Sequence, residues 1–332
     1  MTSNPQVVIN SLPQGKLTPA NYRLEDGEIP TPGAGEVLLK TIAFAITAGT
    51  RAGMQGSASY AGAPKTGIVM NATGVAKVET SEDPSFTAGD VVLGPTGWQQ
   101  YAVAKATQLS RIPESDDPIH YLGPLGVNGL TAYFGLLEVG QPKAGETVMV
   151  SAAAGSVGHL VGQLARIKGA KAVGVCGSDS KCAVLINDLG FAAAVNYKDD
   201  GFRQALKDAS PDGVDVYFDN TGGDVLGSAL FRMNLRGRIA CCGVVSQYDT
   251  DNPAPGPKGI PGLLVNKRLT MQGFLVFDFA ERYEAARQDI RQWLASGELK
   301  CLTDEVQGLQ SAPDAFVDLL AGGNIGTRVV RL

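Results

Sequence analysis

The chain has 332 residues, of which 44% are hydrophobic and 18% charged, a composition typical of a folded globular protein with two domains. The formal net charge is −5 and neither sign forms a long run, so we expect no nucleic acid or anionic membrane among its partners. We see no signal peptide and no apolar stretch near the roughly 20 residues that span a bilayer, and the five cysteines are irregularly spaced, so we expect a cytoplasmic protein with reduced thiols.

The first 125 residues are rich in short β-type runs that glycine and proline interrupt. Three of these runs cover residues 35–47, 67–79 and 90–104, with the sequences GEVLLKTIAFAIT, GIVMNATGVAKVE and DVVLGPTGWQQYAVA. Short strands at this density predict a small, partly open β-barrel.

The pattern changes at residues 129–140, which predict a helix, and apolar strands then alternate with helices. Strands that are apolar nearly throughout are typical of a parallel sheet covered on both faces, so the alternation predicts a doubly wound α/β domain. Its last strand is predicted at 269–279, and an amphipathic helix follows at 281–297. The remaining residues return to the mixed style of the first part. We therefore expect a discontinuous barrel domain of residues 1–125 and 298–332, with a sheet domain of residues 126–297 inserted in it.

The segment SAAAGSVG, residues 151–158, predicts a phosphate-binding turn between a strand and a helix that begins near Ser156. Gly155 and Gly158 keep the two roles that a Cβ would spoil, while Ala153 replaces the first glycine of the usual pattern and fits if its φ is negative. The free N–H groups at the start of the helix favour a phosphate. A purely structural turn is the alternative, but the strand–turn–helix context favours a dinucleotide site.

The end of the next strand, GSDSK at residues 177–181, bears on which dinucleotide binds. An NAD site places a carboxylate there for the ribose hydroxyls, whereas this chain has Gly177 and Ser178, with Lys181 one helical turn later. A hydroxyl and an ammonium group suit a 2′-phosphate, and Tyr197 follows the next strand nearby. These residues predict NADP(H). Asp179 argues against NADP(H), because a carboxylate at this position would favour NAD.

Seven segments together give the chain a family resemblance over almost its whole length. They are GWQQY (97–101), GLTAYFGLLEVGQPKAGETVMVSAAAGSVG (129–158), GSDSK (177–181), VYFDNTGG (216–223), GRIACCGVVSQY (237–248), PAPGP (253–257) and GGNIGTRVV (322–330). With these segments the chain resembles the zinc-independent branch of the medium-chain dehydrogenases/reductases that includes alkenal/one oxidoreductases, prostaglandin reductases and curcumin reductases. The resemblance implies an α/β fold: a GroES-like, partly open β-barrel domain plus a Rossmann domain with a doubly wound parallel sheet.

The resemblance also implies roles for individual residues. It places Gly155, Ser156, Val157 and Gly158 at the pyrophosphate, and Lys181 and Tyr197 at the adenosine 2′-phosphate. The implied contacts to the nicotinamide half are Asn220, Cys242, Val244, Ser246, Tyr248, Phe274, Val276 and Asn324.

The zinc ligands of other family members are missing from the first domain. Residues 1–175 contain no cysteine, the only histidines are His120 and His159, and Gly67-Ile68-Val69 stands where zinc-dependent relatives have Gly-His-Glu. We therefore predict no metal site.

The resemblance implies NADPH-dependent hydride transfer to the β-carbon of an α,β-unsaturated aldehyde or ketone. Without a metal, a hydroxyl or amide must donate a hydrogen bond to the carbonyl oxygen, where charge collects. Tyr248 is the first candidate, since a tyrosine hydroxyl is ordinarily protonated at neutral pH, and Asn128 and Tyr60 follow.

The pocket wall departs from the family at TAGTR (47–51) and at Val127-Asn128, which keeps the substrate open. The alternatives are a zinc-free quinone reductase, a ketone/alcohol oxidoreductase with the same cofactor, or a non-catalytic NADPH-binding protein. The expected partner is a small unsaturated carbonyl compound. We also expect a homodimer, in which the exposed last strand pairs with its copy.

Overall fold

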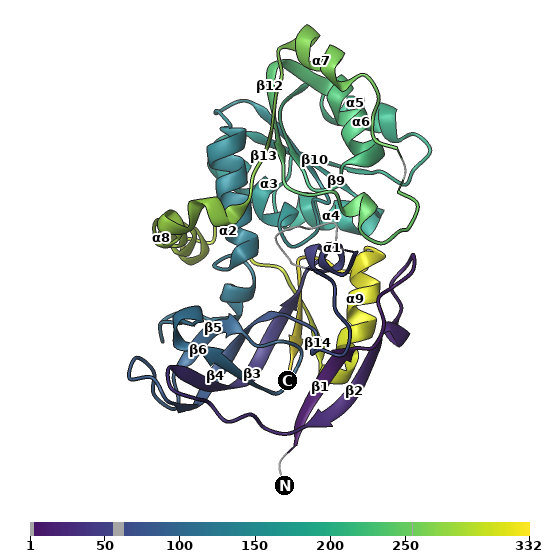
Figure 1. Ribbon diagram of the computed structural model, residues 1–332. Helices are drawn as coiled ribbons and strands as arrows, with labels where there is room; N and C mark the ends of the chain where they lie inside the picture. The colour runs from purple at the N-terminus through teal and green to yellow at the C-terminus, as the bar shows by residue number, and fades with distance from the viewer. Residues whose placement is uncertain (1–2, 56–62, 254) are drawn as a thin grey trace. The chain divides into compact units, whose positions relative to one another are not determined.

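The computed structural model describes residues 3–55, 63–253 and 255–332, and it divides into two compact units (Figure 1). Unit 1 comprises Met1–Gly126, Asp249–Asp251 and Thr303–Leu332. Unit 2 comprises Val127–Tyr248 and Asn252–Leu302. Each unit is continuous in space but not in sequence, so each is described separately below.

Unit 1 is built around a seven-stranded sheet in which β3 is the central strand. The path is β14-β15-β3-β4-β5-β7, and β6 also pairs with β3. The first half of β3 pairs with β6 and its second half with β15, so the sheet curls on itself as a partly open barrel. The described strands of this unit are β1 (Asn4–Ile9), β2 (Tyr22–Gly27), β3 (Glu36–Ile46), β4 (Thr73–Ser81), β5 (Val91–Pro95), β6 (Tyr101–Lys105), β7 (Ser110–Arg111), β14 (Thr303–Gln307) and β15 (Thr327–Arg331).

The core of unit 1 centres on Trp98, whose side chain is buried. Its indole stacks on the rings of Tyr22 and Phe44, with centroids 5.4 and 5.6 Å away, and meets the edge of Phe316 at 6.0 Å. Phe316 belongs to α9 (Ala312–Leu320), so the C-terminal helix is fixed on the sheet by the same cluster. This contact between distant parts of the chain explains why unit 1 needs the C-terminal segment.

Unit 2 contains a six-stranded sheet in which every neighbouring pair is parallel. The strand order β10-β9-β8-β11-β12-β13 is that of a Rossmann fold. Its strands are β8 (Thr147–Ser151), β9 (Lys171–Cys176), β10 (Ala193–Asn196), β11 (Val214–Asp219), β12 (Met233–Cys241) and β13 (Thr270–Gly273). Together with unit 1, this sheet confirms the predicted fold class.

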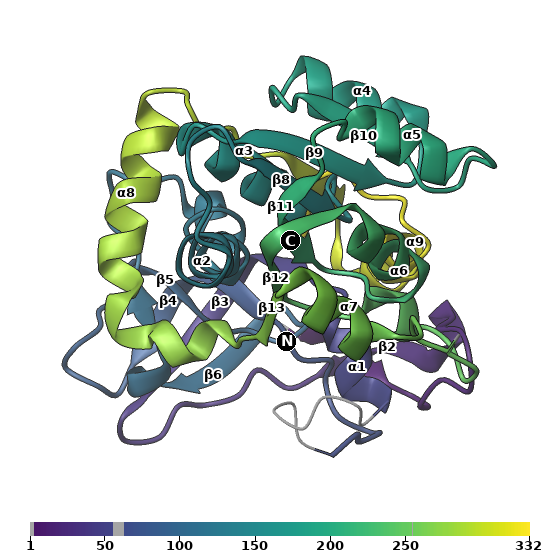
Figure 2. The ribbon, with the colours of Figure 1, turned by 90° about the horizontal axis from the view of Figure 1, so that it is seen from above.

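Helices cover both faces of this sheet, as the apolar strands predicted. One cluster packs α5 (Phe202–Ala209), α6 (Gly223–Arg232) and α7 (Ile260–Lys267) on one face. The helices α2 (Val127–Phe134), α3 (Gly158–Ile167) and α8 (Tyr283–Ala295) lie together in Figure 2, and the Tyr133 hydroxyl of α2 donates to Asp289 of α8 at 2.6 Å. The other described α-helices are α1 (Gly49–Gln55) and α4 (Asp179–Asn187). No helix in the described ranges is both long and apolar enough to cross a membrane.

The predicted last strand over residues 269–279 was wrong in its length. The strand β13 ends at Gly273, and a 3₁₀ segment begins at Val276. The chain leaves the sheet because Val276 is buried among Leu130 and Phe134, which anchors this apolar segment to the helices and not to the strand ladder.

Candidate functional site

The carboxyl ends of β8 and β11 lie side by side where the strand order reverses. Parallel α/β sheets bind ligands at such a switch point. Ser151 ends β8, and its hydroxyl oxygen accepts the backbone N–H of Asn220, just after β11, at 2.9 Å. The Asn220 side-chain amide donates back to the Ser151 carbonyl oxygen at 2.7 Å. This reciprocal pair sets the register of the two strand ends.

The glycine turn follows β8, and its shape depends on close backbone packing. A Cβ on Gly158 would lie 2.3 Å from the carbonyl oxygen of Ala152, so only glycine fits this approach of helix to strand. A Cβ on Gly155 would lie 3.2 Å from the same oxygen, a milder conflict. The left-handed residue of the turn is Ala152, with φ of 47°, while Ala153 is not among the residues of positive φ. Ala153 therefore has the negative φ that it needs in order to replace the first glycine of the pattern.

The helix α3 begins at Gly158, two residues later than predicted, so Ser156 and Val157 belong to the turn. Helix α3 is 10 residues long, and the backbone N–H groups of His159, Leu160 and Val161 in its first turn donate to the carbonyl oxygens of Gly155 and Val157 in the preceding turn. The positive end of the helix dipole lies at this turn and favours an anionic group there.

His159 supports the turn from beneath and is fully buried. Its Nδ1 lies 2.8 Å from the Gly155 carbonyl oxygen, and its Nε2 accepts the backbone N–H of Leu302 at 3.3 Å. This pair of partners requires a neutral ring with the proton on Nδ1. Burial lowers the pKa of His159 to about 4, which keeps the ring neutral at physiological pH. The imidazole thus fixes the turn without carrying charge.

Asp219 ends β11 and is nearly inaccessible to solvent, with 2% exposure. One carboxylate oxygen accepts the Tyr217 hydroxyl at 2.9 Å and the backbone N–H groups of Thr221 and Gly222 at 3.0 and 2.9 Å. Burial, together with this neighbouring carboxylate, raises the pKa of the Tyr217 hydroxyl well above its ordinary value, so that it acts as a donor. Asp219 therefore folds the segment after β11 into a fixed turn.

The three residues predicted at the 2′-phosphate are brought together at the end of β9. Ser178 caps α4, and its hydroxyl oxygen accepts the backbone N–H of Lys181 at 3.3 Å. The backbone N–H of Tyr197 donates to the carbonyl oxygen of Cys176, which places the half-exposed Tyr197 beside Gly177. The cluster therefore combines a hydroxyl, an ammonium group, an aromatic ring and the N-terminal end of a helix.

Asp179 lies in the same cluster, but its carboxylate has another partner. The Asn196 amide donates to Asp179 at 3.1 Å and to Asp199 at 2.9 Å. This bond ties Asp179 to the end of β10.

Four predicted nicotinamide contacts lie on one loop after β12, folded over the end of β11. The backbone N–H of Cys242 donates to the carbonyl oxygen of Asp219 at 2.8 Å. The hydroxyl of Ser246 donates to the carbonyl oxygen of Thr221 at 2.6 Å. The Tyr248 hydroxyl accepts the backbone N–H of Val244 at 3.3 Å. Asn220, Cys242, Val244, Ser246 and Tyr248 are thus brought together by short-range loop contacts.

Other predicted residues are placed differently. The Phe274 ring meets the ring of Phe218 with centroids 6.1 Å apart, so it packs toward the sheet. The Val276 side chain lies in the apolar cluster with Leu130 and Phe134 of α2, and its carbonyl oxygen accepts the Tyr283 hydroxyl at 3.0 Å. The structure therefore does not bring the Val276 side chain to the loop after β12.

Of the three remaining candidates, Asn128 and Asn324 belong to different units, and Tyr60 is not among the described residues. Asn128 is buried in the first turn of α2, in unit 2. Asn324 belongs to unit 1, where its amide donates to the Gly326 carbonyl oxygen at 2.8 Å. Tyr60 lies outside the described residues.

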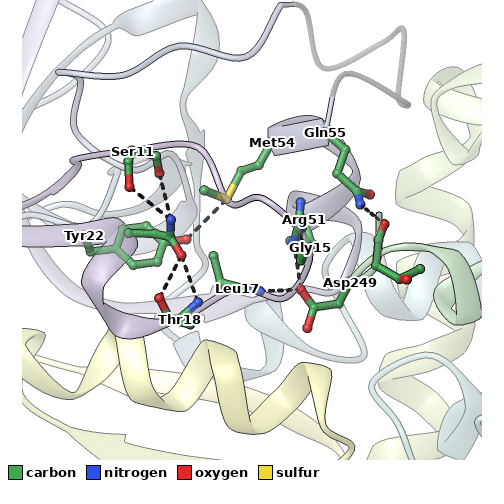
Figure 3. Close-up of polar contacts among 11 residues, drawn as sticks. Ser11, Gly15, Leu17, Thr18, Tyr22, Arg51, Met54, Gln55 and Asp249 are labelled. Atoms are coloured by element: carbon green, nitrogen blue, oxygen red, sulfur yellow. Dashed lines mark hydrogen bonds and ion pairs between the residues drawn. The ribbon is translucent and has the colours of Figure 1, made fainter. Parts of the chain in front are cut away.

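Segment 249–251 directly follows Tyr248 and belongs to unit 1, where a buried arginine holds it (Figure 3). Arg51 of α1 is fully buried; its Nε lies 3.0 Å from an Asp249 carboxylate oxygen, and its Nη2 donates to the Gly15 carbonyl oxygen at 2.6 Å. The same Asp249 oxygen accepts the backbone N–H of Leu17 at 2.7 Å. We call Arg51, Asp249, Gly15 and Leu17 the Arg51 cluster. It lies at the TAGTR departure, where a Cβ on Gly49 would meet no atom within 4 Å.

The sequence reasoning missed several residues that build the site. Asp219, Ser151 and His159 are buried polar residues within or next to apolar runs. A polar residue in an apolar run is unusual, and this feature of the sequence could have identified them as site residues. Asp249 carried no such signal, because its partner Arg51 is 198 positions away.

The described residues fit a phosphorylated dinucleotide. They supply a turn that side chains larger than glycine would fill, a helix end, and a serine hydroxyl with a lysine three residues later at the end of the neighbouring strand. Within residues 3–55, 63–253 and 255–332, no group of three or more His, Cys, Asp or Glu side chains is placed to hold a metal ion.

Comparison with known proteins matches two stretches of the chain to family models. Residues 5–112 match the family described as the N-terminal domain of oxidoreductase, and residues 156–292 match the family described as zinc-binding dehydrogenase. The second match begins within the glycine turn, at Ser156, and covers Ser178, Lys181, Tyr197 and the loop after β12.

Whole-length relatives give a finer comparison. The chain is 37% identical to the NADPH-dependent curcumin reductase of Escherichia coli, over 99% of this chain and 97% of that protein. It is 40% identical to a 2-alkenal reductase (NADP(+)-dependent) of Nicotiana tabacum, with the same shares of the two chains. The crystal structure of CurA in complex with NADPH from Vibrio vulnificus superposes with a TM-score of 0.93 at 37% identity, covering 98% of each chain.

Proposed function

The chain belongs to the medium-chain dehydrogenase/reductase family, among its NADP-dependent reductases, and from this premise we propose that it reduces the C=C bond of α,β-unsaturated aldehydes and ketones with NADPH. The observation that carries the proposal is the switch point of unit 2. There the glycine turn, the 2′-phosphate cluster and a loop bearing a tyrosine hydroxyl all lie at the carboxyl edge of one parallel sheet.

The chain's own residues bind and orient the cofactor in this proposal. The backbone of Gly155, Ser156, Val157 and Gly158 receives the pyrophosphate at the start of α3. The loop with Cys242, Val244 and Ser246, together with Asn220, orients the nicotinamide half. The Phe274 ring packs on Phe218 of β11, at the sheet. When bound, NADPH supplies a hydride from C4 of its nicotinamide ring.

The preference for NADP(H) over NAD rests on the cluster at the end of β9. Ser178 and Lys181 offer a hydroxyl and a cation to the 2′-phosphate, and Tyr197 lies beside them. Asp179 is the residue that would favour NAD, and its bond to Asn196 directs its carboxylate toward the end of β10. A carboxylate held there opposes a 2′-phosphate less than one aimed at the ribose.

Tyr248 is the proposed donor to the substrate carbonyl oxygen. Its hydroxyl accepts the Val244 N–H, an arrangement that orients the phenol. A donor fixed before the reaction stabilises the negative charge that develops on the carbonyl oxygen without reorganising during the step. Asn128 and Tyr60 are the second candidates for this contact.

We further propose a cytoplasmic homodimer formed through β13. This strand ends the sheet, and three of its four residues are exposed, so its free edge can pair with a second copy. Analytical ultracentrifugation of the wild type and of a β13 proline variant tests this part separately.

The experiment that tests the reaction is a screen of NADPH oxidation over alkenals, cyclic enones, quinones and simple ketones, with NADH in parallel. We expect turnover on alkenals or enones, products that keep the carbonyl group, and a preference for NADPH. Turnover confined to quinones would instead indicate a zinc-free quinone reductase. Products with a reduced carbonyl would indicate a ketone/alcohol oxidoreductase. NADPH binding without any turnover would leave a non-catalytic protein.

The donor role is tested with Tyr248→Phe. Loss of a single such donor lowers the rate by about 10²–10³-fold. We expect that loss in kcat with little change in the Kd for NADPH, because the phenyl ring retains its packing. A fall of less than about threefold on every accepted enone contradicts the role of Tyr248, and Asn128→Ala is then the next variant to measure.

A further inference from the structure

Two cysteines lie together at the end of β9, beside the 2′-phosphate cluster. Cys176 is the last residue of β9 and is buried, while Cys182 lies in the first turns of α4 and is partly exposed. Their sulfur atoms are 3.1 Å apart, and both cysteines are free thiols. The short segment between them contains Ser178 and Lys181.

We propose that Cys176 and Cys182 are a modification site at which a reversible disulfide forms and weakens the binding of NADPH. The site lies in unit 2 alone, and the family roles assigned to this segment concern only the cofactor phosphate. The effect on NADPH rests on the proposed function, whereas the formation of the bond does not.

The reaction is a thiol–disulfide exchange with a small disulfide such as oxidised glutathione. The Cys182 thiolate attacks one sulfur of that disulfide and releases one glutathione thiolate, giving a mixed disulfide. The Cys176 thiolate then attacks the Cys182 sulfur and releases the second glutathione. Two protein thiols are oxidised, one disulfide is reduced to two thiols, and the two protons pass to solvent and to the leaving thiolates.

The order of attack follows from exposure. Cys182 is the more accessible thiol, and Cys176 is already at the distance needed to resolve the mixed disulfide. Burial raises the pKa of the Cys176 thiol to about 12, and burial also raises the pKa of Cys182. Few thiolates are present at neutral pH, so exchange is slow and is best equilibrated for hours at mildly alkaline pH.

The bond would reshape the segment that carries the 2′-phosphate groups. A disulfide joins its sulfurs at about 2.05 Å, so the two sulfurs must approach by roughly 1 Å from their present 3.1 Å. That movement draws the first turn of α4 toward β9 and disturbs the Ser178 cap, whose hydroxyl oxygen is 3.3 Å from the Lys181 N–H. A hydroxyl and an ammonium group set for a phosphate are then displaced together.

Formation of the disulfide is tested by peptide mapping, because a tryptic cleavage site lies between the two cysteines. Trypsin cleaves after Lys171, Lys181 and Lys198, so it separates Cys176 and Cys182 into peptides 172–181 and 182–198. We equilibrate the full chain across a range of oxidised to reduced glutathione and digest it without reductant. We expect the two peptides to be linked in the wild type and in the control Cys301→Ser, and to be separate in Cys182→Ser and Cys176→Ala.

The consequence is tested by titrating NADPH and NADH into the oxidised and reduced proteins. We expect oxidation to raise the Kd for NADPH by about tenfold or more, the effect of losing one charge-assisted hydrogen bond, with little change for NADH. A thiol reductant restores the affinity, and Cys182→Ser shows no response to oxidation.

Each outcome bears on one part of the proposal. If the peptides stay separate even in oxidised glutathione alone, the modification site is wrong. If the peptides are linked but the Kd values for NADPH and NADH change equally or not at all, the coupling to the 2′-phosphate is wrong. Failure of the proposed function gives a different result: the reduced protein would bind NADPH no better than NADH, while the peptide map would be unaffected.

Discussion

The glycine turn of unit 2 and the Arg51 cluster of unit 1 are both partly buried, but different interactions hold them. The turn is fixed by close packing and a neutral hydrogen bond. A Cβ on Gly158 has no room, and the uncharged His159 ring hydrogen-bonds to the Gly155 carbonyl oxygen. The Arg51 cluster is held by a fully buried cation whose partner Asp249 keeps 21% of its side-chain surface exposed. Steric support tolerates almost no change in shape, whereas ionic support depends on the charge and its partner.

The largest effect is expected for Gly158→Ala. The added Cβ would lie 2.3 Å from the Ala152 carbonyl oxygen and 2.8 Å from the Ala153 Cα, both backbone atoms that cannot move alone. We expect a loss of about 3–5 kcal/mol in the free energy of unfolding, far above the roughly 1 kcal/mol that alanine contributes over glycine in a helix. Thermal unfolding measures it. The control is Gly155→Ala, where the nearest atom is 3.2 Å away, and equal losses in both variants would contradict the steric account.

The next effect is expected for Arg51→Met, which leaves the Asp249 carboxylate without its cation. Breaking a buried ion pair typically costs about 3–5 kcal/mol, and the partial exposure of Asp249 reduces our expectation to about 3 kcal/mol. Calorimetry of the full chain gives the change. Arg23→Met is the matched control, because its pair with Glu25 is exposed and is worth less than about 1 kcal/mol. A loss as small for Arg51 as for Arg23 would show that the cluster is not an ionic support.

A third effect depends on pH and concerns the neutral ring beneath the turn. The folded-state pKa of His159 is about 4 against 6.5 for the model imidazole, so between these values the unfolded chain binds a proton that the folded chain does not. Stability from His159 is therefore complete above about pH 6.5 and is lost as the pH falls toward 4. Between about pH 7 and pH 5 we expect a loss of about 2 kcal/mol.

Denaturant midpoints measured across that pH range test this expectation in the wild type and in His159→Gln. The variant has no titrating ring, so its midpoint should fall less steeply in acid. His120→Gln removes the other histidine of the chain and serves as the control. Equal slopes in the wild type and His159→Gln would exclude His159 as the source.

The smallest effect is expected for Ala152→Gly. Ala152 has φ of 47°, and a left-handed conformation costs an L-residue about 1–2 kcal/mol, part of which glycine gives back through its greater freedom in the unfolded chain. We expect a gain of no more than about 1 kcal/mol in the free energy of unfolding. Ala153→Gly, one residue later and buried, should instead lose stability. If Ala152→Gly loses as much as Ala153→Gly, then the conformation of Ala152 stores no strain.

The local patterns of the chain determined much of this protein. The alternation of apolar strands and helices predicted the parallel sheet, and the segment with Gly155 and Gly158 predicted the close turn between β8 and α3. The proximity of Ser178, Lys181 and Tyr197 could also be predicted, because parallel strands bring their carboxyl ends to one edge of the sheet. Each of these inferences needs only residues close in sequence, or the regular geometry of one sheet.

Only the tertiary structure decided the contacts between distant residues. Arg51 and Asp249 are partners across 198 positions, and Leu302 reaches His159 across 143. The end of β13 at Gly273 and the close approach of Cys176 and Cys182 likewise depend on three-dimensional packing. The physical reason is that burial, and with it the pairing of charges and the spacing of thiols, depends on which surfaces meet, and local periodicity contains no information about that.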